Sequence, residues 1–414
     1  MREEAYTTVR FRGFETVTPA GWGLPAAVDA AGGEAVQAAL GVDWAEIVER
    51  VRHVGYDFLP GLYDDQVGAL RHYYGAKDGE LGPLDSGNFL MALNFVVMYD
   101  LFGDREMLTR AERCFTWAMA NCCETHPMDF WQGGVRDGNR PWDLWVKYSG
   151  DAFWLALALY RRTGAAEYAQ AIAMFHNFLK RAREAGFAYV FDTRTYAWRS
   201  RGNAWRAFGF PVTGYLEWYE QGQDPRAREE ALAWGRAALE LQAPSGLFHL
   251  IDGEFWNSDL AAPELRGLVY LWEETGERTF LHSAVRYADA MLALQRADGA
   301  WPLGVDRDGE VCVATVGPGD VPNIAMSLVR LHGATGDGRY LDAACRAIRY
   351  SLSVQAVVGG KYALHLDDPR VRWGYWSWDP LYDETLSGDQ SIHHIRGTLF
   401  VAAYLAALAH GGVG

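Results

Sequence analysis

Aspartate is the residue best placed to do chemistry in this chain, because it recurs where short polar turns meet apolar segments. An Asp with apolar surroundings can hold a proton near neutral pH and serve as a general acid or base in glycosidic chemistry. The six turns are Asp85-Ser-Gly-Asn88, Tyr148-Ser-Gly-Asp151, Ser200-Arg-Gly-Asn203, Trp256-Asn-Ser-Asp259, Gly317-Pro-Gly-Asp320 and Leu386-Ser-Gly-Asp389.

Asp151 is the strongest candidate among these carboxylates. The segment that follows it, Ala-Phe-Trp-Leu-Ala-Leu-Ala-Leu, is apolar on every face, so we expect Asp151 to be partly removed from water. Asp is also a common N-cap residue, and a purely structural role at a helix start is the alternative for Asp151. For Asp259, Asp320 and Asp389 the capping role is the favoured interpretation.

Two adjacent histidines, His393 and His394, follow the last turn and are further candidates for proton transfer. Neighbouring residues on a helix point about 100° apart, so we expect one of the two to face a cavity and not both. The sequence has no His-Glu-x-x-His motif, Walker loop or nucleophile-elbow serine. We therefore expect neither a metal nor a cofactor.

The spacing of the turns indicates which elements must position these residues. Measured between their last residues, the turns are 63, 52, 56, 61 and 69 residues apart. Between them lie tight glycine turns, each preceded by an apolar run and followed by an amphipathic one, which is typical of a helix-to-helix connection. These are Phe102-Gly-Asp104, Thr163-Gly164, Gln221-Gly-Gln-Asp224, Thr275-Gly276 and Thr335-Gly-Asp337.

Each repeat is therefore predicted to be an αα-hairpin, as expected for a chain with long-period internal repeats. With an opening helix near residues 43–54 and a closing helix at residues 389–410, the pattern amounts to six hairpins. The sequence predicts an all-α fold, an (α/α)6 barrel over residues 44–414, with an irregular N-terminal arm at residues 1–43 packed on it.

In such a barrel the helices that begin at the polar turns are parallel, so their N-termini gather at one end and favour anions there. The loops at that end are rich in aromatic residues, whose flat faces suit the C–H faces of sugars. We expect substrate contacts from Trp145, Lys147, Tyr148, Arg201, Asn203, Trp205, Trp256, Trp376, Trp378, Asp389 and Arg396.

Composition narrows the classes of partner. The net charge of -15 disfavours nucleic acid and anionic membranes, although basic residues near the helix starts leave an anionic small ligand possible. The first residues lack the apolar core of a signal peptide, and the five cysteines have no zinc-like spacing. We therefore expect a cytoplasmic protein with reduced cysteines; the sequence gives no expectation for its oligomeric state.

The segment from Trp198 to Phe210, Trp-Arg-Ser-Arg-Gly-Asn-Ala-Trp-Arg-Ala-Phe-Gly-Phe, resembles a known family. Unsaturated glucuronyl hydrolases and unsaturated rhamnogalacturonyl hydrolases carry a similar Trp-x-Arg-Gly-Gln/Asn-Ala/Gly-Trp segment at an inner helix of an (α/α)6 barrel. The resemblance implies that Asp151 protonates the C4=C5 double bond of an unsaturated uronic acid and activates water for addition at C5. It also implies Asp85 as the partner carboxylate, and Arg201 and Trp205 as sugar contacts.

Three functions follow from these observations. The leading hypothesis is a glycan-active enzyme that releases a terminal sugar, uronic or unsaturated uronic, from an oligosaccharide, with Asp151 as acid and base. The second is a lyase or sugar epimerase on the same barrel, in which Tyr148, His393 or His394 removes a proton and Arg396 neutralises the developing enolate. The third is a sugar-binding barrel without turnover.

Overall fold

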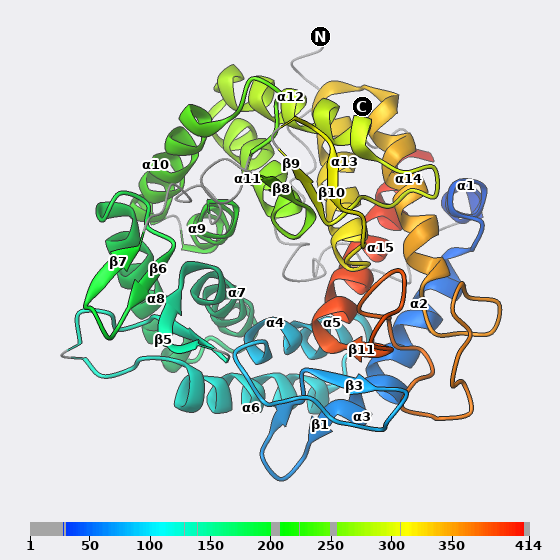
Figure 1. Cartoon of the computed structure of the whole chain (residues 1–414), viewed down its shortest axis with the longest axis horizontal. Coiled ribbons are helices and arrows are strands. Elements are labelled where there is room, and N and C mark those ends of the chain that lie inside the picture. The colour runs from blue at the N-terminus through cyan, green and yellow to red at the C-terminus, as the bar shows by residue number, and fades with distance from the viewer. Residues whose placement is uncertain are drawn as a thin grey trace.

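The computed structural model describes residues 28, 30–127, 129–138, 140–199, 208–222, 224–248, 255–306 and 308–409. Helices form two concentric rings (Figure 1). The architecture is the all-α (α/α)6 barrel that the turn spacing predicts.

The helices of the inner ring are buried on nearly every side, because each packs both on its neighbours in the ring and on the outer layer. In α13, for example, every residue from Asp320 to Leu331 is buried. Apolar residues on all faces are what such a position requires. The inner helices are α4 (Asn88–Met91) with α5 (Leu93–Phe102), α7 (Val146–Thr163), α9 (Gly209–Gly222), α11 (Ser258–Thr275), α13 (Asp320–Thr335) and α15 (Gly388–Ala409).

The glycine turns connect the inner helices to the outer ring as predicted. Gly103, Gly164, Gly276 and Gly336 end their helices in the left-handed conformation, with φ between 67° and 72°, which a residue without Cβ adopts at low cost. The outer helices that follow are α6 (Arg105–Cys122), α8 (Ala166–Glu184), α10 (Pro225–Leu241), α12 (Arg278–Leu294) and α14 (Gly338–Ser353).

The N-terminal part of the described chain completes the outer ring. Helix α2 (Trp44–His53) is capped by Asp43, whose side chain accepts a hydrogen bond from the Glu46 amide at 2.7 Å. A π-helical turn (Val54–Phe58) and α3 (Leu59–Leu62) continue it. The region expected to be an irregular arm contains a further helix, α1 (Ala30–Leu40), which packs on α14 and α15.

Short strands occupy parts of the long loops, which the helical periodicity did not predict. They form a sheet of β4 (Val135–Asp137), β5 (Arg140–Trp145), β6 (Val190–Asp192) and β7 (Ala197–Arg199), and another of β8 (Phe255–Asn257), β9 (Gly304–Asp306) and β10 (Val311–Val313). Strand β1 (Tyr63–Asp64) pairs with β2 (Ala69–Leu70), and β3 (Tyr73–Gly75) pairs antiparallel with β11 (Thr385–Ser387).

Three of these strands run directly into inner helices. Strand β5 leads into α7, β8 into α11 and β11 into α15, with no intervening residue. Because each strand is paired with a neighbour, the start of the helix that follows it is held in place. The strands thus fix the positions of the first turns of three inner helices.

Two helix starts differ from the prediction. Helix α7 begins at Val146 and not at Asp151, so Asp151 lies in its second turn and is not an N-cap. Helix α9 is described from Gly209, whereas its start was predicted near Asn203; residues 200–207 lie outside the described part of the chain. Helix α15 has the length and apolar composition of a membrane span, but 78% of that segment is buried inside the protein, as in a core helix.

Candidate active site

A cavity of about 800 Å³ lies at the end of the barrel where the strands meet the inner helices. Its outer part is lined by the chain around His72 to Leu90, by the loop from Ser377 to Thr385, and by the first turns of α7 and α15. A smaller inner part of about 50 Å³ continues among α7, α9, α11, α13 and α15. The two parts share Leu90, Lys147, Asp151, Asp389 and Gln390, so they belong to one site.

Asp151 lies at the junction of the two parts. It is 3% exposed, and its Oδ1 atom has no hydrogen-bond partner among the described residues. Burial raises its pKa to about 7, with a further contribution from the negative charge of Asp259, while Lys147 opposes the shift. A carboxyl group in this state holds its proton near neutral pH and can donate it.

Lys147 and Asp259 form an ion pair beside Asp151. The Lys147 ammonium donates a hydrogen bond to Asp259 Oδ2 at 2.7 Å, which ties α7 to α11. Burial alone would raise the pKa of Asp259, but the charge of Lys147 outweighs it and the pKa is lowered. Asp259 is therefore an ionised carboxylate a short way from a protonated one.

Asp320 is the second buried acid of the inner part. The hydroxyl of Ser258 donates a hydrogen bond to Asp320 Oδ2 at 2.5 Å. Burial, assisted by the charge of Asp259, raises the pKa of Asp320 to about 8. Asp320 is thus largely protonated at physiological pH, and its hydroxyl group can donate a hydrogen bond.

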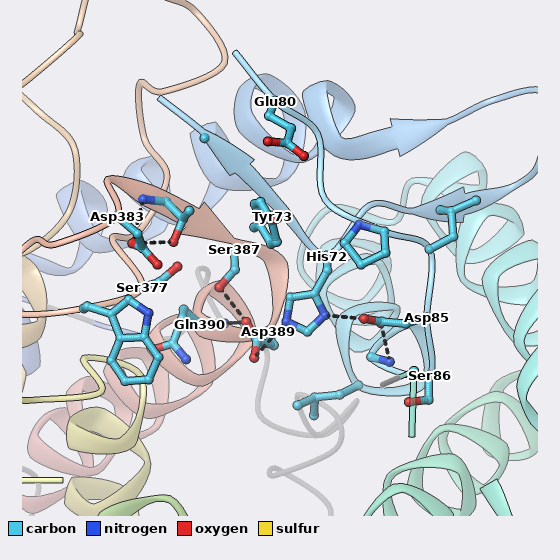
Figure 2. Close-up of a pocket in the computed structure, with 18 of the residues that line it drawn as sticks. His72, Tyr73, Glu80, Asp85, Ser86, Ser377, Asp383, Ser387, Asp389 and Gln390 are labelled. Carbon is cyan, nitrogen blue, oxygen red and sulfur yellow. Dashed lines mark hydrogen bonds and ion pairs between the residues drawn. The ribbon is translucent and has the colours of Figure 1, made fainter. Parts of the chain in front are cut away.

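His72 lies between two carboxylates on the wall of the outer part (Figure 2). Its Nδ1 is 2.9 Å from Asp85 Oδ2, and its Nε2 is 3.9 Å from Asp389 Oδ2. Burial disfavours the charged ring, but the contact with Asp85 and the attraction of Asp389 outweigh it and raise the pKa of His72 to about 9. His72 is therefore an imidazolium that neutralises part of the charge of both acids.

Asp389 lies in the first turn of the last inner helix, α15, and is held by short hydrogen bonds. The Ser387 hydroxyl donates to its Oδ1 at 2.5 Å, and the Gln390 amide donates to the same atom at 2.7 Å (Figure 2). Burial would raise the pKa of Asp389, but His72 and Ser387 outweigh it and lower the pKa. The carboxylate is ionised and faces both parts of the cavity.

No protein-family model matches the chain, and no curated protein matches it in sequence. Solved structures match it over most of its length. A D-mannose isomerase has a TM-score of 0.70 at 13% identity, covering 86% of this chain and 97% of that one. Cellobiose 2-epimerase from Bacillus thermoamylovorans has a TM-score of 0.66 at 12% identity, covering 86% of this chain and 99% of that one. An unsaturated glucuronyl hydrolase specific for heparin has a TM-score of 0.56 at 13% identity, covering 91% of this chain and 98% of that one.

The chain has the six-hairpin fold of these sugar-active enzymes. The isomerase and the epimerase have higher TM-scores than the hydrolase, although the sequence resemblance pointed to the hydrolases. At these identities the match concerns the fold, and the chemistry has to be argued from the site of this chain.

Within the six-hairpin barrel the two histidines take different places. His393 lines the inner part of the cavity, and burial together with the charge of Arg396 lowers its pKa to about 4. His394 is fully buried on the other side of α15, where its ring stacks on Tyr375 at 3.8 Å and its Nδ1 lies 2.5 Å from the Ser351 hydroxyl. The catalytic role considered for His394 is therefore not supported by its position, because it faces α14 and not the cavity.

Of the aromatic residues predicted to contact substrate, some line the cavity and others do not. Tyr148 and Trp378 line the outer part of the cavity. Trp145 does not line the cavity and packs edge-on against Tyr148 and Tyr189. Trp256 and Trp376 do not line the cavity.

Both of these tryptophans are fully buried with bonded indole groups, so they belong to the core and their predicted sugar contacts are corrected. Trp256 donates to the Tyr287 hydroxyl at 2.9 Å, and Trp376 donates to the Tyr362 carbonyl at 3.1 Å.

Of the basic residues predicted to contact substrate, the structure places one in the cavity lining. Lys147 lines the cavity, whereas Arg396 does not line it but lies over the ring of Trp154, with its guanidinium 5.5 Å from the ring centre. Arg266, which the sequence did not single out, lines the inner part and lies over the same ring at 4.8 Å. Arg201, Asn203 and Trp205 lie outside the described residues.

Sequence reasoning also missed His72. It lies between the opening helices and the first polar turn, in a segment without repeat or motif that could have marked it. Asp85, expected as the direct partner of Asp151, contacts His72 and accepts a hydrogen bond from the Gly87 amide at 2.9 Å. Among the residues that the structure describes, no group of three or more His, Cys, Asp or Glu side chains could hold a metal ion.

Proposed function

We propose that the protein is a glycoside hydrolase that releases a terminal sugar from an oligosaccharide, with Asp151 as the general acid. The observation that carries the proposal is the state of Asp151: it is buried at the junction of the two parts of the cavity, one of its oxygens is unpartnered among the described residues, and its pKa is about 7. A proton donor for a leaving oxygen needs these properties.

Release from a chain end fits the shape of the cavity. The inner part is small and lies among the inner helices, while the outer part is wide and is lined by loops. A terminal sugar can reach the junction at Asp151, and the remainder of the oligosaccharide extends past Tyr148 and Trp378. An aromatic wall beside polar groups suits the two kinds of surface on a sugar ring.

The proton of Asp151 moves to the glycosidic oxygen while the bond from that oxygen to the sugar carbon breaks, and the electron pair stays on the oxygen. A water oxygen forms the new bond to the carbon and loses a proton to a carboxylate. In an unsaturated uronide, Asp151 instead protonates C4 as the double bond breaks, and a water oxygen bonds to C5 and loses a proton to a carboxylate. The hemiketal formed at C5 then opens, and the glycosidic bond breaks as the sugar is released. Both routes need a protonated Asp151 and a nearby ionised base.

We further propose that the terminal sugar is acidic. An acidic sugar is favoured by the resemblance in residues 198–210 and by Lys147 and Arg266 in the lining. The rim of the cavity carries Asp78, Glu80 and Asp383, which disfavour further negative charge along the oligosaccharide. We therefore propose a uronic or unsaturated uronic sugar at the chain end, followed by neutral sugars.

The test is a panel of oligosaccharides and aryl glycosides with saturated, unsaturated and neutral terminal sugars, assayed for released sugar by mass spectrometry. Asp151→Asn should lower turnover by about 10²–10⁴-fold while binding persists. An Asp151→Asn protein with wild-type turnover would remove the proposal. Binding without turnover of any member would instead favour a sugar-binding barrel.

A sugar epimerase or isomerase is the second candidate, and His393 is the observation that favours it. Its ring lines the inner part of the cavity, is neutral above about pH 4, and has an Nδ1 atom without a hydrogen-bond partner among the described residues. A neutral imidazole can remove the proton next to a sugar carbonyl. Incubating free saturated sugars in D₂O separates the two functions, because epimerisation places deuterium on the carbon next to the carbonyl and a hydrolase leaves that carbon unexchanged.

A further inference from the structure

The contact between His72 and Asp389 is built into the fold at the backbone level. Strand β3 follows His72 and pairs with β11, with Tyr73 opposite Ser387. The amide of Gly388 donates a hydrogen bond to the His72 carbonyl at 3.3 Å, so His72 is attached directly to the start of α15. Asp85, which begins the turn into α4, holds the other side of the ring. The segment from His72 to Asp85 therefore meets the distant start of α15 at this imidazole (Figure 2).

Asp389 occupies a position that the other carboxylates of the site do not share. Among the described carboxylates, Asp151 and Asp389 line both parts of the cavity. Asp85 lines the outer part, and Asp259 and Asp320 line the inner part. Asp259 is bonded to Lys147 and Asp320 to Ser258.

Asp389, by contrast, directs one oxygen to the Ser387 hydroxyl and the Gln390 amide and the other toward His72, whose Nε2 is 3.9 Å away. This separation is longer than a hydrogen bond, so Asp389 Oδ2 keeps capacity to accept a proton.

We infer that Asp389 is the second catalytic carboxylate, which receives the proton of the attacking water, and that His72 is the positioning residue that Asp85 anchors against it. This inference rests on the hydrolase proposed above. As the water oxygen bonds to the sugar carbon, its O–H bond breaks and the proton goes to Asp389 Oδ2. The glycosidic bond breaks at the same carbon, and the leaving oxygen takes the proton of Asp151, so charge and protons balance.

The inference assigns Asp85 a role different from the one expected from the sequence. Asp85 acts through His72 and does not reach the inner part of the cavity. His72 supplies positive charge that keeps Asp389 ionised, so its loss should make Asp389 easier to protonate. The titratable and charged groups that face Asp389 are His72, Lys147, Asp151, Asp259, Asp320 and His393.

Asp389→Asn is the direct test, since Asn can still accept the bonds from Ser387 and Gln390. We expect kcat to fall by about 10²–10⁴-fold with binding of a substrate oligosaccharide retained. The matched control is Asp337→Asn, the same change at the start of α14, where the side chain caps the helix away from the cavity. Wild-type kcat in Asp389→Asn, together with an inactive Asp151→Asn, would overturn this inference and leave the proposed hydrolase intact.

His72→Gln tests the positioning role with a readout that a structural role would not move. The variant should have a lower kcat, and the acidic limb of its pH–kcat profile should shift to higher pH, because Asp389 loses a neighbouring cation. An unchanged acidic limb would contradict the role given to His72. If Asp389→Asn does not fold, this shift decides the inference by itself. Full activity of both Asp151→Asn and Asp389→Asn would mean that the proposed hydrolase, and not only its second carboxylate, is wrong.

Discussion

The ammonium of Lys147 lies 2.7 Å from the carboxylate of Asp259 and joins the first turns of two inner helices, α7 and α11. The contact crosses the ring at the level of the cavity, since both residues line its inner part. The pair therefore contributes both to the closure of the barrel and to the electrostatics of Asp151. These two contributions can be separated by mutation.

Lys147→Met should destabilise the protein, because it leaves Asp259 without its partner. Asp259 has 42% of its side chain exposed toward the cavity, so water can replace part of the lost interaction, and we expect a loss of about 1–3 kcal/mol in the free energy of unfolding. The double variant Lys147→Met/Asp259→Asn should be more stable than Lys147→Met alone. Chemical denaturation of the four proteins measures the coupling, and additive losses would show that the two residues do not interact.

The pH dependence of activity should report Asp151. A general acid works while protonated, so kcat should fall as the pH rises through about 7, the pKa of Asp151. Lys147→Met removes a positive charge that lowers this pKa, so it should move the basic limb to higher pH. A basic limb that stays in place in Lys147→Met would indicate that another group controls it.

The free energy of unfolding should also depend on pH through the titration of Asp151. Its pKa is about 7 in the folded protein against 3.8 for the free side chain, so the folded state binds more protons between these values and stability falls as the pH rises through this window. Asp151→Asn abolishes the titration. The variant should therefore gain stability relative to the wild type between pH 4 and pH 8, by up to about 4 kcal/mol.

In the same denaturation experiment, Asp337→Asn should lose stability relative to the wild type as the pH rises, which is opposite to the gain expected for Asp151→Asn. Arg339 lowers the pKa of Asp337, so its carboxylate stabilises the folded state above the ordinary Asp pKa and loses this effect as the pH falls. Equal pH dependence of the two variants would show that the stability change at position 151 does not come from its ionisation.

The order of helices could be predicted from the sequence because its signals are local. A helix that ends in a left-handed residue needs glycine at that position, and Gly103, Gly164, Gly276 and Gly336 mark such ends without reference to the rest of the fold. The contact of His72 with Asp389 is different. It depends on the pairing of β3 with β11, which are far apart in the sequence and too short to give a periodic signal.

The direction in which a side chain points was the second feature that the sequence could not predict. The angle between adjacent helix residues predicts that His393 and His394 face different ways, but the choice between them is made by Ser351 and Tyr375, which receive His394 on the outer side of α15. Likewise, a tryptophan in a loop can face a cavity, as Trp378 does, or complete the core, as Trp256 does. Both residues lie next to polar residues in the sequence, so local polarity does not decide between the two positions.

The close packing of the inner ring can be tested at Gly397. A Cβ atom added there would lie 2.3 Å from the Pro322 carbonyl oxygen of α13, so Gly397→Ala should push α15 away from α13 and cost about 1–3 kcal/mol or more. Gly338→Ala in α14 is the control, because nothing lies within 4 Å of its added Cβ. Equal melting temperatures for the two variants would contradict the contact between the two inner helices.

The charge of the substrate is decided by which guanidinium reaches it. A protein with a net charge of -15 repels anions at long range, so binding a uronate needs local cations and helix N-termini inside the cavity. Arg266 lines the inner part, whereas Arg396 lies over Trp154 outside the lining. A planar guanidinium can hold a carboxylate through two hydrogen bonds, and an ammonium cannot reproduce that geometry.

Arg266→Lys should therefore weaken binding of a uronide more than binding of the matching neutral glycoside. Arg396→Lys should affect the two ligands equally, since its position allows an effect through Trp154 but no direct contact. Arg201→Lys extends the comparison to the segment that carries the sequence resemblance. Calorimetric titration of the wild type and the three variants with both ligands measures these differences. Equal affinity of the wild-type protein for the two sugars would remove the acidic substrate and leave a neutral-sugar enzyme with the same Asp151 chemistry.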